Sequence, residues 1–150
     1  MLFSIYNKPI GVGLLIARGV LMKIVISDTK SGKSYQTDVE KGKELALIGK
    51  KIGETFDGGV FGAAGYTLEI TGGSDSSGFP MRKDVPENRK ITALVSEGPG
   101  FRPTRKGERK KKILRGNAVS QETAQVNMKV KEAGPTALEQ LFPKKEAAKK

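Results

Sequence analysis

The sequence contains no cysteine, no histidine and no tryptophan, and only 6% of its 150 residues are aromatic. The absence of cysteine excludes disulfide bonds and the thiolate zinc sites of small domains. The absence of histidine excludes Ser-His-Asp and Cys-His catalytic arrangements. No residue pattern points to a metal or an organic cofactor, so we expect neither. A chain of this length suits one domain with tails.

Long apolar runs are also lacking. The most apolar stretch, residues 1–21, is interrupted by Lys8, Pro9 and Arg18, and no unbroken run approaches the ~20 residues that a transmembrane helix needs. The stretch also lacks the basic start and small-residue cleavage site of a secretory signal. We therefore expect no membrane association. We predict that Met22 is the natural start and that residues 1–21 are a non-native upstream extension, which the intact mass of the native protein tests.

Acidic residues are few relative to basic ones, and 27 Lys and Arg against 16 Asp and Glu give a net charge of +11. The excess is concentrated in residues 82–116, where 12 basic and 4 acidic residues give +8. Residues 22–81 contain 7 basic and 8 acidic residues, a net charge of −1. A small protein this basic usually binds a polyanion, although a solvated basic face is the alternative. We predict a neutral scaffold followed by a polyanion-binding segment.

Apolar and polar residues alternate along several short segments, which is typical of half-buried strands. Residues 23–27 and 35–39 are separated by a turn and predict a hairpin. Similar runs lie at residues 66–70, 90–96 and 123–132. The fold class predicted is mainly β, with a small β-barrel-like domain of about seven short strands over residues 22–132. One short helix is expected at residues 44–48, and residues 133–150 are predicted to form a short helical turn and a basic C-terminal tail.

The segment SDTKSGKS, residues 27–34, ends like a phosphate-binding P-loop. That motif needs a glycine five residues before Gly32, where this chain has Ser27. A strand-like sequence follows instead of the helix that the motif requires. We therefore predict no nucleotide site and no small-molecule substrate.

The segment GGSDSSGFPM, residues 72–81, combines turn-forming residues with two large apolar side chains. Its glycines permit positive φ or close backbone approach, and Asp75 can accept hydrogen bonds from backbone N–H groups two residues on. Phe79 and Met81 are expected to dock onto apolar surface and hold the loop in place. A nuclease that uses Asp75 with Mg²⁺ is a competing hypothesis, but no paired carboxylates support it. The predicted structural loop comprises Gly72, Gly73, Asp75, Gly78, Phe79, Pro80 and Met81.

A run of basic residues occupies positions 102–115, with eight basic side chains and one glutamate. Pro103 and Gly107 oppose a regular helix, so we expect an extended loop that follows a ribose-phosphate chain, and then a strand. Aromatic residues are scarce nearby, so phosphate and shape contacts are expected to dominate over base stacking. The predicted RNA contacts are Arg82, Lys83, Arg102, Arg105, Lys106, Arg109, Lys110, Lys111, Lys112 and Arg115.

Two blocks resemble those of a known family. ITGGSDSSGFPM, residues 70–81, resembles the signature of the archaeal and eukaryotic small-subunit ribosomal protein S6e family at every position, and residues 102–116 resemble its second block. The short form resembles the archaeal members. The resemblance implies a β-barrel-like domain in the cytoplasmic ribosome, a structural role and no enzymatic activity. It also implies small-subunit ribosomal RNA and neighbouring ribosomal proteins as partners. A free-standing RNA chaperone or translation-associated factor is the alternative function.

Overall fold

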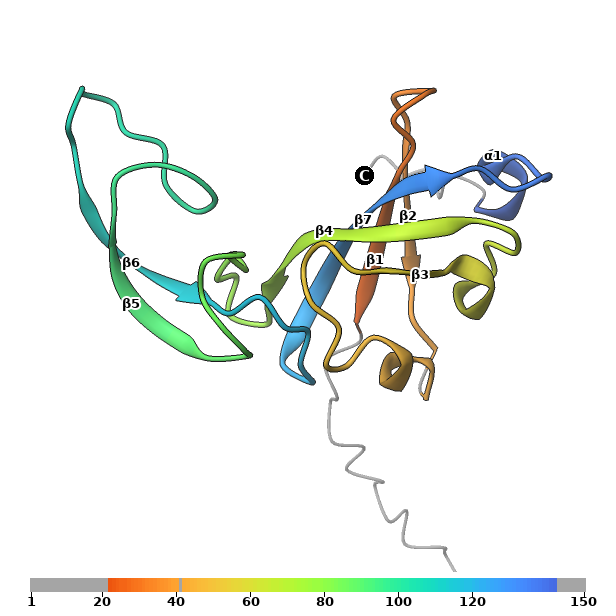
Figure 1. Ribbon diagram of the computed structural model, residues 1–150, viewed down its shortest axis with the longest axis horizontal. Helices are drawn as coiled ribbons and strands as arrows, with labels where there is room; N and C mark the ends of the chain where they lie inside the picture. The colour runs from red at the N-terminus through yellow and green to blue at the C-terminus, as the bar shows by residue number, and fades with distance from the viewer. Residues whose placement is uncertain (1–21, 41, 143–150) are drawn as a thin grey trace, which may run out of the picture.

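The computed structural model describes residues 22–40 and 42–142 (Figure 1). The predicted upstream extension, residues 1–21, and the predicted tail from residue 143 onward lie outside the described residues. The strands are β1 (Lys23–Ser27), β2 (Ser34–Asp38), β3 (Thr55–Asp57), β4 (Thr67–Asp75), β5 (Lys90–Val95), β6 (Lys110–Arg115) and β7 (Thr123–Glu132). The helical turns are the 3₁₀ segments η1 (Lys43–Ala46) and η2 (Gly58–Phe61), and α1 (Leu138–Leu141).

Five of the strands form one sheet in the order β2-β1-β7-β4-β3. Strands β1 and β2 form the predicted antiparallel hairpin, while β1 and β7 run parallel. The long strands β4 and β7 pair antiparallel, and Thr71 interrupts their register between Ile70 and Gly72. The mainly β class is therefore confirmed. Within the described residues the strands form open sheets and do not close into a barrel.

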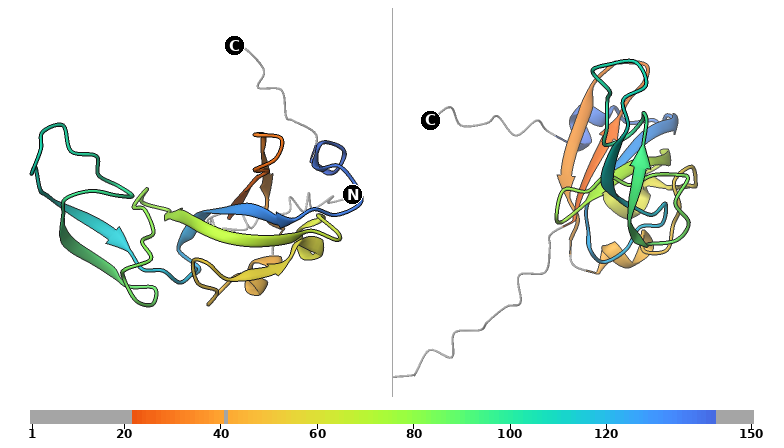
Figure 2. Two further views of the ribbon diagram at one scale, coloured as in Figure 1. Left: turned by 45° about the horizontal axis from the view of Figure 1, so that its top comes forward. Right: turned by 90° about the vertical axis from the view of Figure 1, so that its left-hand side faces the viewer.

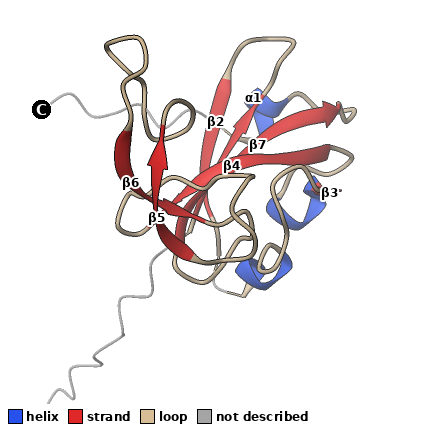
Figure 3. Cartoon of the chain, turned by 60° about the vertical axis from the view of Figure 1, so that its left-hand side comes forward, coloured by secondary structure: helices blue, strands red, loops and turns tan. Residues whose placement is uncertain are grey.

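The hydrophobic core lies on one face of the five-stranded sheet. Period-2 alternation in β1, β4 and β7 directs one apolar set inward, and its members Ile24, Leu68, Ile70 and Val126 are fully buried. The turns that cover this face add further buried side chains, among them Leu47, Phe61 and Leu138. Figure 3 shows the helical turns around this sheet and away from β5 and β6. The helix predicted at residues 44–48 is observed as η1, a single 3₁₀ turn at Lys43–Ala46.

Strands β5 and β6 form a separate two-stranded sheet, which the isolated parallel bridge between Met81 and Arg115 links to the rest of the fold. The hairpin projects from the five-stranded sheet, at the left of Figure 1, and Figure 2 shows the same separation from a second direction. We call residues 90–115, which comprise β5, the connecting loop and β6, the basic arm. On the inner face of its hairpin Val95 and Leu114 are buried. The scaffold and the basic segment that the charge distribution predicted are thus two distinct parts of the fold.

The turn between β1 and β2 contains the P-loop-like sequence, and a hairpin strand rather than a helix follows it. Lys33 in this turn forms an ion pair with Glu139 of α1. The hydrogen bond and the charge of Glu139 raise the pKa of Lys33 above its ordinary 10.5. The same contact lowers the pKa of Glu139 below its ordinary 4.5. No helix in the described part of the chain is long and apolar enough to cross a membrane.

Candidate nucleic-acid interface

The loop at residues 72–81 begins inside β4 and turns sharply after Asp75. A Cβ on Gly73 would lie 2.2 Å from the carbonyl oxygen of Gln125, so β7 passes too close for any side chain. Gly78 has a φ of 81°, a left-handed conformation that glycine adopts without strain. The N–H of Gly78 donates to the carbonyl of Asp75 at 2.8 Å, which closes the turn. Met81 is buried in the core as predicted.

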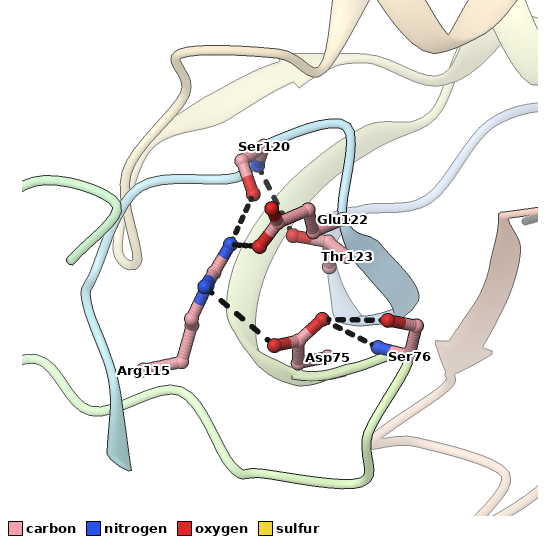
Figure 4. A network of polar contacts seen from close by, with 6 residues as sticks. All are labelled: Asp75, Ser76, Arg115, Ser120, Glu122 and Thr123. Carbon is pink, nitrogen blue, oxygen red and sulfur yellow. Dashed lines mark hydrogen bonds and ion pairs between the residues drawn. The ribbon is translucent and has the colours of Figure 1, made fainter. Parts of the chain in front are cut away.

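The carboxylate of Asp75 lies at the junction between the five-stranded sheet and the basic arm (Figure 4). One oxygen accepts hydrogen bonds from the N–H and the hydroxyl of Ser76, at 2.6 and 3.0 Å. These donors belong to the next residue, whereas the sequence predicted a donor two residues on. The other oxygen lies 3.6 Å from the guanidinium of Arg115, at the end of β6. Asp75 is therefore an internal acceptor, as predicted, and also the partner of a cation from the arm.

Arg115 links three chain segments at this junction (Figure 4). Its Nη2 donates to the Ser120 hydroxyl at 3.2 Å and forms an ion pair with Glu122. Asp75 is 4% exposed and Arg115 6% exposed, while the side chain of Glu122 is 66% exposed. Nε of Arg115 is buried without a hydrogen-bond partner among the described residues. The pairing of Asp75 with Arg115 is thus shielded from solvent, while Glu122 closes the network at the surface.

Backbone contacts tie the same loop to the base of the arm. The N–H of Arg115 donates to the carbonyl of Pro80 at 2.9 Å, and the N–H of Arg82 donates to the carbonyl of Arg115 at 3.0 Å. Gly100, in the arm loop, lies so close to Pro80 that an added Cβ would be 2.6 Å from the Pro80 ring. The ammonium of Lys90 lies 4.4 Å from the centre of the Phe79 ring. The loop at residues 72–81 therefore contacts both strands and the connecting loop of the arm.

Most of the predicted RNA contacts lie on the arm with their charged groups exposed. Of the ten predicted contacts, only Arg82 and Arg115 form ion pairs with carboxylates of the described residues. Six lie within residues 102–111, Lys112 is half-buried, and Lys83 precedes the arm. The residues in this group are Lys83, Arg102, Arg105, Lys106, Arg109, Lys110, Lys111 and Lys112.

Two predicted contacts, Arg82 and Arg115, have protein partners instead. Arg82 forms an ion pair with Asp84, and its Nη1 lies 3.5 Å from the carbonyl of Glu97. Arg115 is buried in the network described above, so it presents no free guanidinium on the surface. Arg115 is buried because the junction packs over the last residues of β6, whereas the first residues of this strand are exposed.

The one glutamate of the basic run, Glu108, has a structural role that the sequence analysis missed. Its carboxylate accepts hydrogen bonds from the N–H groups of Thr104 and Arg105, at 2.9 and 3.4 Å. The N–H of Glu108 in turn donates to the carbonyl of Arg105 at 3.1 Å. Glu108 thus closes the turn that presents Arg105 and Lys106.

The environment of Asp75 does not fit the nuclease hypothesis. Its carboxylate is buried, accepts two hydrogen bonds from Ser76 and faces the positive charge of Arg115. A metal-binding catalytic carboxylate needs access to substrate and to the ion. Among the described residues no group of three or more acidic side chains is arranged to hold a metal.

Comparison with known proteins now identifies the family. Residues 22–143 match the family model described as Ribosomal protein S6e. The chain is 48% identical over 120 residues to small ribosomal subunit protein eS6 of Methanocaldococcus jannaschii, covering 80% of this chain and 89% of the relative. It is 49% identical over 120 residues to the protein of the same name from Methanothermobacter thermautotrophicus, covering 80% and 94%. For the namesake of Methanoregula boonei the identity is 45% over 131 residues, covering 87% and 92%. The chain therefore belongs to the ribosomal protein S6e family, as its two sequence blocks predicted, and is a ribosomal structural protein rather than an enzyme.

Proposed function

We propose that this protein is a structural constituent of the small ribosomal subunit in the cytoplasm, and that it binds ribosomal RNA through the basic arm. The names of its relatives support its place in the small ribosomal subunit. Its further partners are neighbouring ribosomal proteins. Its function is to neutralise phosphates and to hold a fold of the RNA without turning over a substrate. The cations assigned to RNA are Lys83, Arg102, Arg105, Lys106, Arg109, Lys110, Lys111 and Lys112.

The observation that carries this proposal is the set of arm cations without carboxylate partners. Six exposed Lys and Arg side chains lie between Arg102 and Lys111, on a hairpin that projects from a sheet of nearly balanced charge. Like charges this close repel each other unless a polyanion neutralises them. Arginine also presents a planar fork that binds phosphate through two hydrogen bonds. Counterion release predicts that RNA affinity falls steeply with salt. The salt slope, which is the slope of log affinity against log salt concentration, should be roughly −0.7 to −0.9 per phosphate neutralised.

Charge reversal in the arm loop tests the proposal. We expect Arg105→Glu combined with Arg109→Glu to abolish binding to small-subunit ribosomal RNA while the domain stays folded, because both side chains are exposed and unpaired. The matched control reverses Lys23 and Lys30, exposed cations of the sheet and its hairpin turn, and changes the net charge equally. Filter binding at physiological salt measures the affinity. Unchanged affinity of the arm variant, or equal loss in the control, rejects the arm as the binding site.

A free-standing RNA chaperone or translation-associated factor is the second candidate, because an exposed basic arm binds many RNAs by charge alone. The two functions differ in how firmly the protein is held. A ribosomal constituent sediments with the small subunit after a high-salt wash. A chaperone that binds RNA only through screened charge contacts is released by that wash.

A further inference from the structure

The hairpin of the basic arm has one exposed face that charge does not explain. Opposed residues of an antiparallel pair share a face, so Leu94 with Lys111 and Thr92 with Ile113 lie on the same side of β5 and β6. Leu94 is 58% exposed and Ile113 is 37% exposed. We call this side, which carries Thr92, Leu94, Lys111 and Ile113, the outer face. It places two aliphatic side chains as diagonal neighbours in the most basic part of the protein.

The inner face of the same hairpin shows that the apolar groups of the outer face are not core residues. Val95 and Leu114 point inward and are buried, and the Leu114 side chain lies near Gly100 of the arm loop. The arm therefore has its own small apolar contact on one side. On the other side Leu94 and Ile113 contact solvent, which is unfavourable for aliphatic surface unless a partner covers it.

We propose that the outer face docks into the minor groove of an A-form RNA helix, with Leu94 and Ile113 against the riboses and Lys111 on an adjacent phosphate. The inference rests on the proposed function and adds the RNA element that the arm takes. Charge complementarity selects RNA, because Lys111 on this face has no carboxylate partner in the described chain. Lys110 and Lys112, which also have none, lie on the inner face of the same hairpin and add to the positive charge of the arm.

The shape of the surface selects the groove. The A-form minor groove is wide and shallow and displays the sugars, whereas its major groove is too deep and narrow for side chains to reach. A two-stranded ribbon with short aliphatic side chains fits a wide, shallow groove. An unpaired base instead needs an aromatic platform for stacking. Of the two aromatic residues close by, Phe101 lies in the connecting loop and not on the paired strands that carry the outer face. The ring of Phe79 already has the ammonium of Lys90 4.4 Å from its centre.

Binding of the full chain to a short RNA duplex, and to a DNA duplex of the same sequence, tests the proposal over a range of salt concentrations. We expect Leu94→Ser to lower affinity for duplex RNA about five- to tenfold at every salt concentration, because apolar contact is lost. The salt slope should not change, since no cation is removed. Affinity for duplex DNA should also stay constant, because the minor groove of DNA is narrower, about 6 Å wide. Lys111→Gln should instead reduce the slope by about 0.9.

The matched control is Leu45→Ser, which removes a leucine that is 71% exposed on η1, outside the arm. It should bind both duplexes like the wild type, and thermal unfolding verifies that both variants remain folded. The proposal is overturned if Leu94→Ser binds duplex RNA like the wild type, or loses as much affinity for duplex DNA. If Arg105→Glu with Arg109→Glu weakens RNA binding while Leu94→Ser does not, only the groove assignment fails. If neither variant has a lower RNA affinity than the wild type, the proposed function itself fails.

Discussion

Replacing Asp75 by alanine tests whether the buried network at the arm junction holds the fold together. The change removes the acceptor of two hydrogen bonds from Ser76 and the charge 3.6 Å from the guanidinium of Arg115. Arg115 keeps the Ser120 hydroxyl and Glu122 as partners. Because the side chain of Glu122 is 66% exposed, solvent screens its charge, and Arg115 remains a buried and incompletely neutralised cation.

The cost follows from the burial of the two partners, whose side chains are 7% exposed for Arg115 and 3% exposed for Asp75. Removing one partner of a buried ion pair costs about 3–5 kcal/mol, and the remaining contact with Glu122 places this case near 3 kcal/mol. Domains of this size unfold with about 5–15 kcal/mol, so the loss is a large fraction of the total. At about 2–4 °C per kcal/mol for a domain of about 150 residues, the midpoint of thermal unfolding should fall by roughly 6–12 °C.

Urea unfolding followed by far-UV circular dichroism measures the free energy of unfolding. The matched control, Glu122→Ala, removes the exposed partner of the same arginine and should cost less than about 1 kcal/mol. Replacing Arg115 by methionine in the Asp75→Ala background removes the unpaired cation and should restore part of the loss. Under conditions where the variant is folded, RNA affinity should fall several-fold, because the arm is no longer held. A stability and an RNA affinity equal to those of the wild type would refute the assigned role of Asp75.

Three further predictions concern the loop, the arm and the end of the fold. Gly73→Ala should destabilise the protein by about 1–3 kcal/mol in urea unfolding, because a Cβ would meet the β7 backbone at 2.2 Å, whereas Gly72→Ala, with nothing within 4 Å, should be nearly neutral. Glu108→Ala should weaken RNA binding without changing global stability, because it frees the arm turn; unchanged affinity in filter binding would contradict this. The ion pair between Lys33 and Glu139 is fully formed above pH 4.5, the ordinary pKa of Glu139. In the folded protein the pKa of Glu139 is lower than this, so the ion pair should be lost as the pH falls through that lower pKa. An NMR titration of α1 detects the loss. If the α1 resonances do not change over that range, the contact does not hold α1.

The local parts of the fold could be predicted from the sequence because they depend on residues close in the chain. The period-2 pattern of Leu68 and Ile70, which continues from Tyr66 just before the strand, sets one buried face of β4, and the run at residues 23–27 sets β1. The parallel pairing of β1 with β7 could not be predicted, since it joins segments about a hundred residues apart whose patterns fit several partners. The barrel-like part of the expectation was too specific for the same reason, because it also depended on pairing between distant strands. Strand count and turn spacing do not specify whether a sheet closes.

The candidate site was predictable in composition but not in orientation. The charge run located the arm, because exposed cations need no particular neighbour to be recognised in a sequence. The burial of Arg115 gave no such signal, since alternation along β6 places it on the same side as Lys111 and Ile113, which are exposed. Its burial depends on Asp75 and on the connection into β7, and only the tertiary fold brings these segments together.

Two arginines of the second sequence block, Arg115 and Arg105, differ in physical function, and this difference predicts how each position tolerates an Arg→Lys exchange. At Arg115 the guanidinium contacts three partners, and the single ammonium of lysine cannot reproduce this geometry, so Arg115→Lys should cost roughly 1–3 kcal/mol of stability. At Arg105 the side chain is exposed and supplies charge, so Arg105→Lys should leave stability unchanged and RNA affinity within a few-fold. Urea unfolding and filter binding of the two variants separate these effects. Equal stability losses at both positions would show that the junction does not depend on the arginine fork.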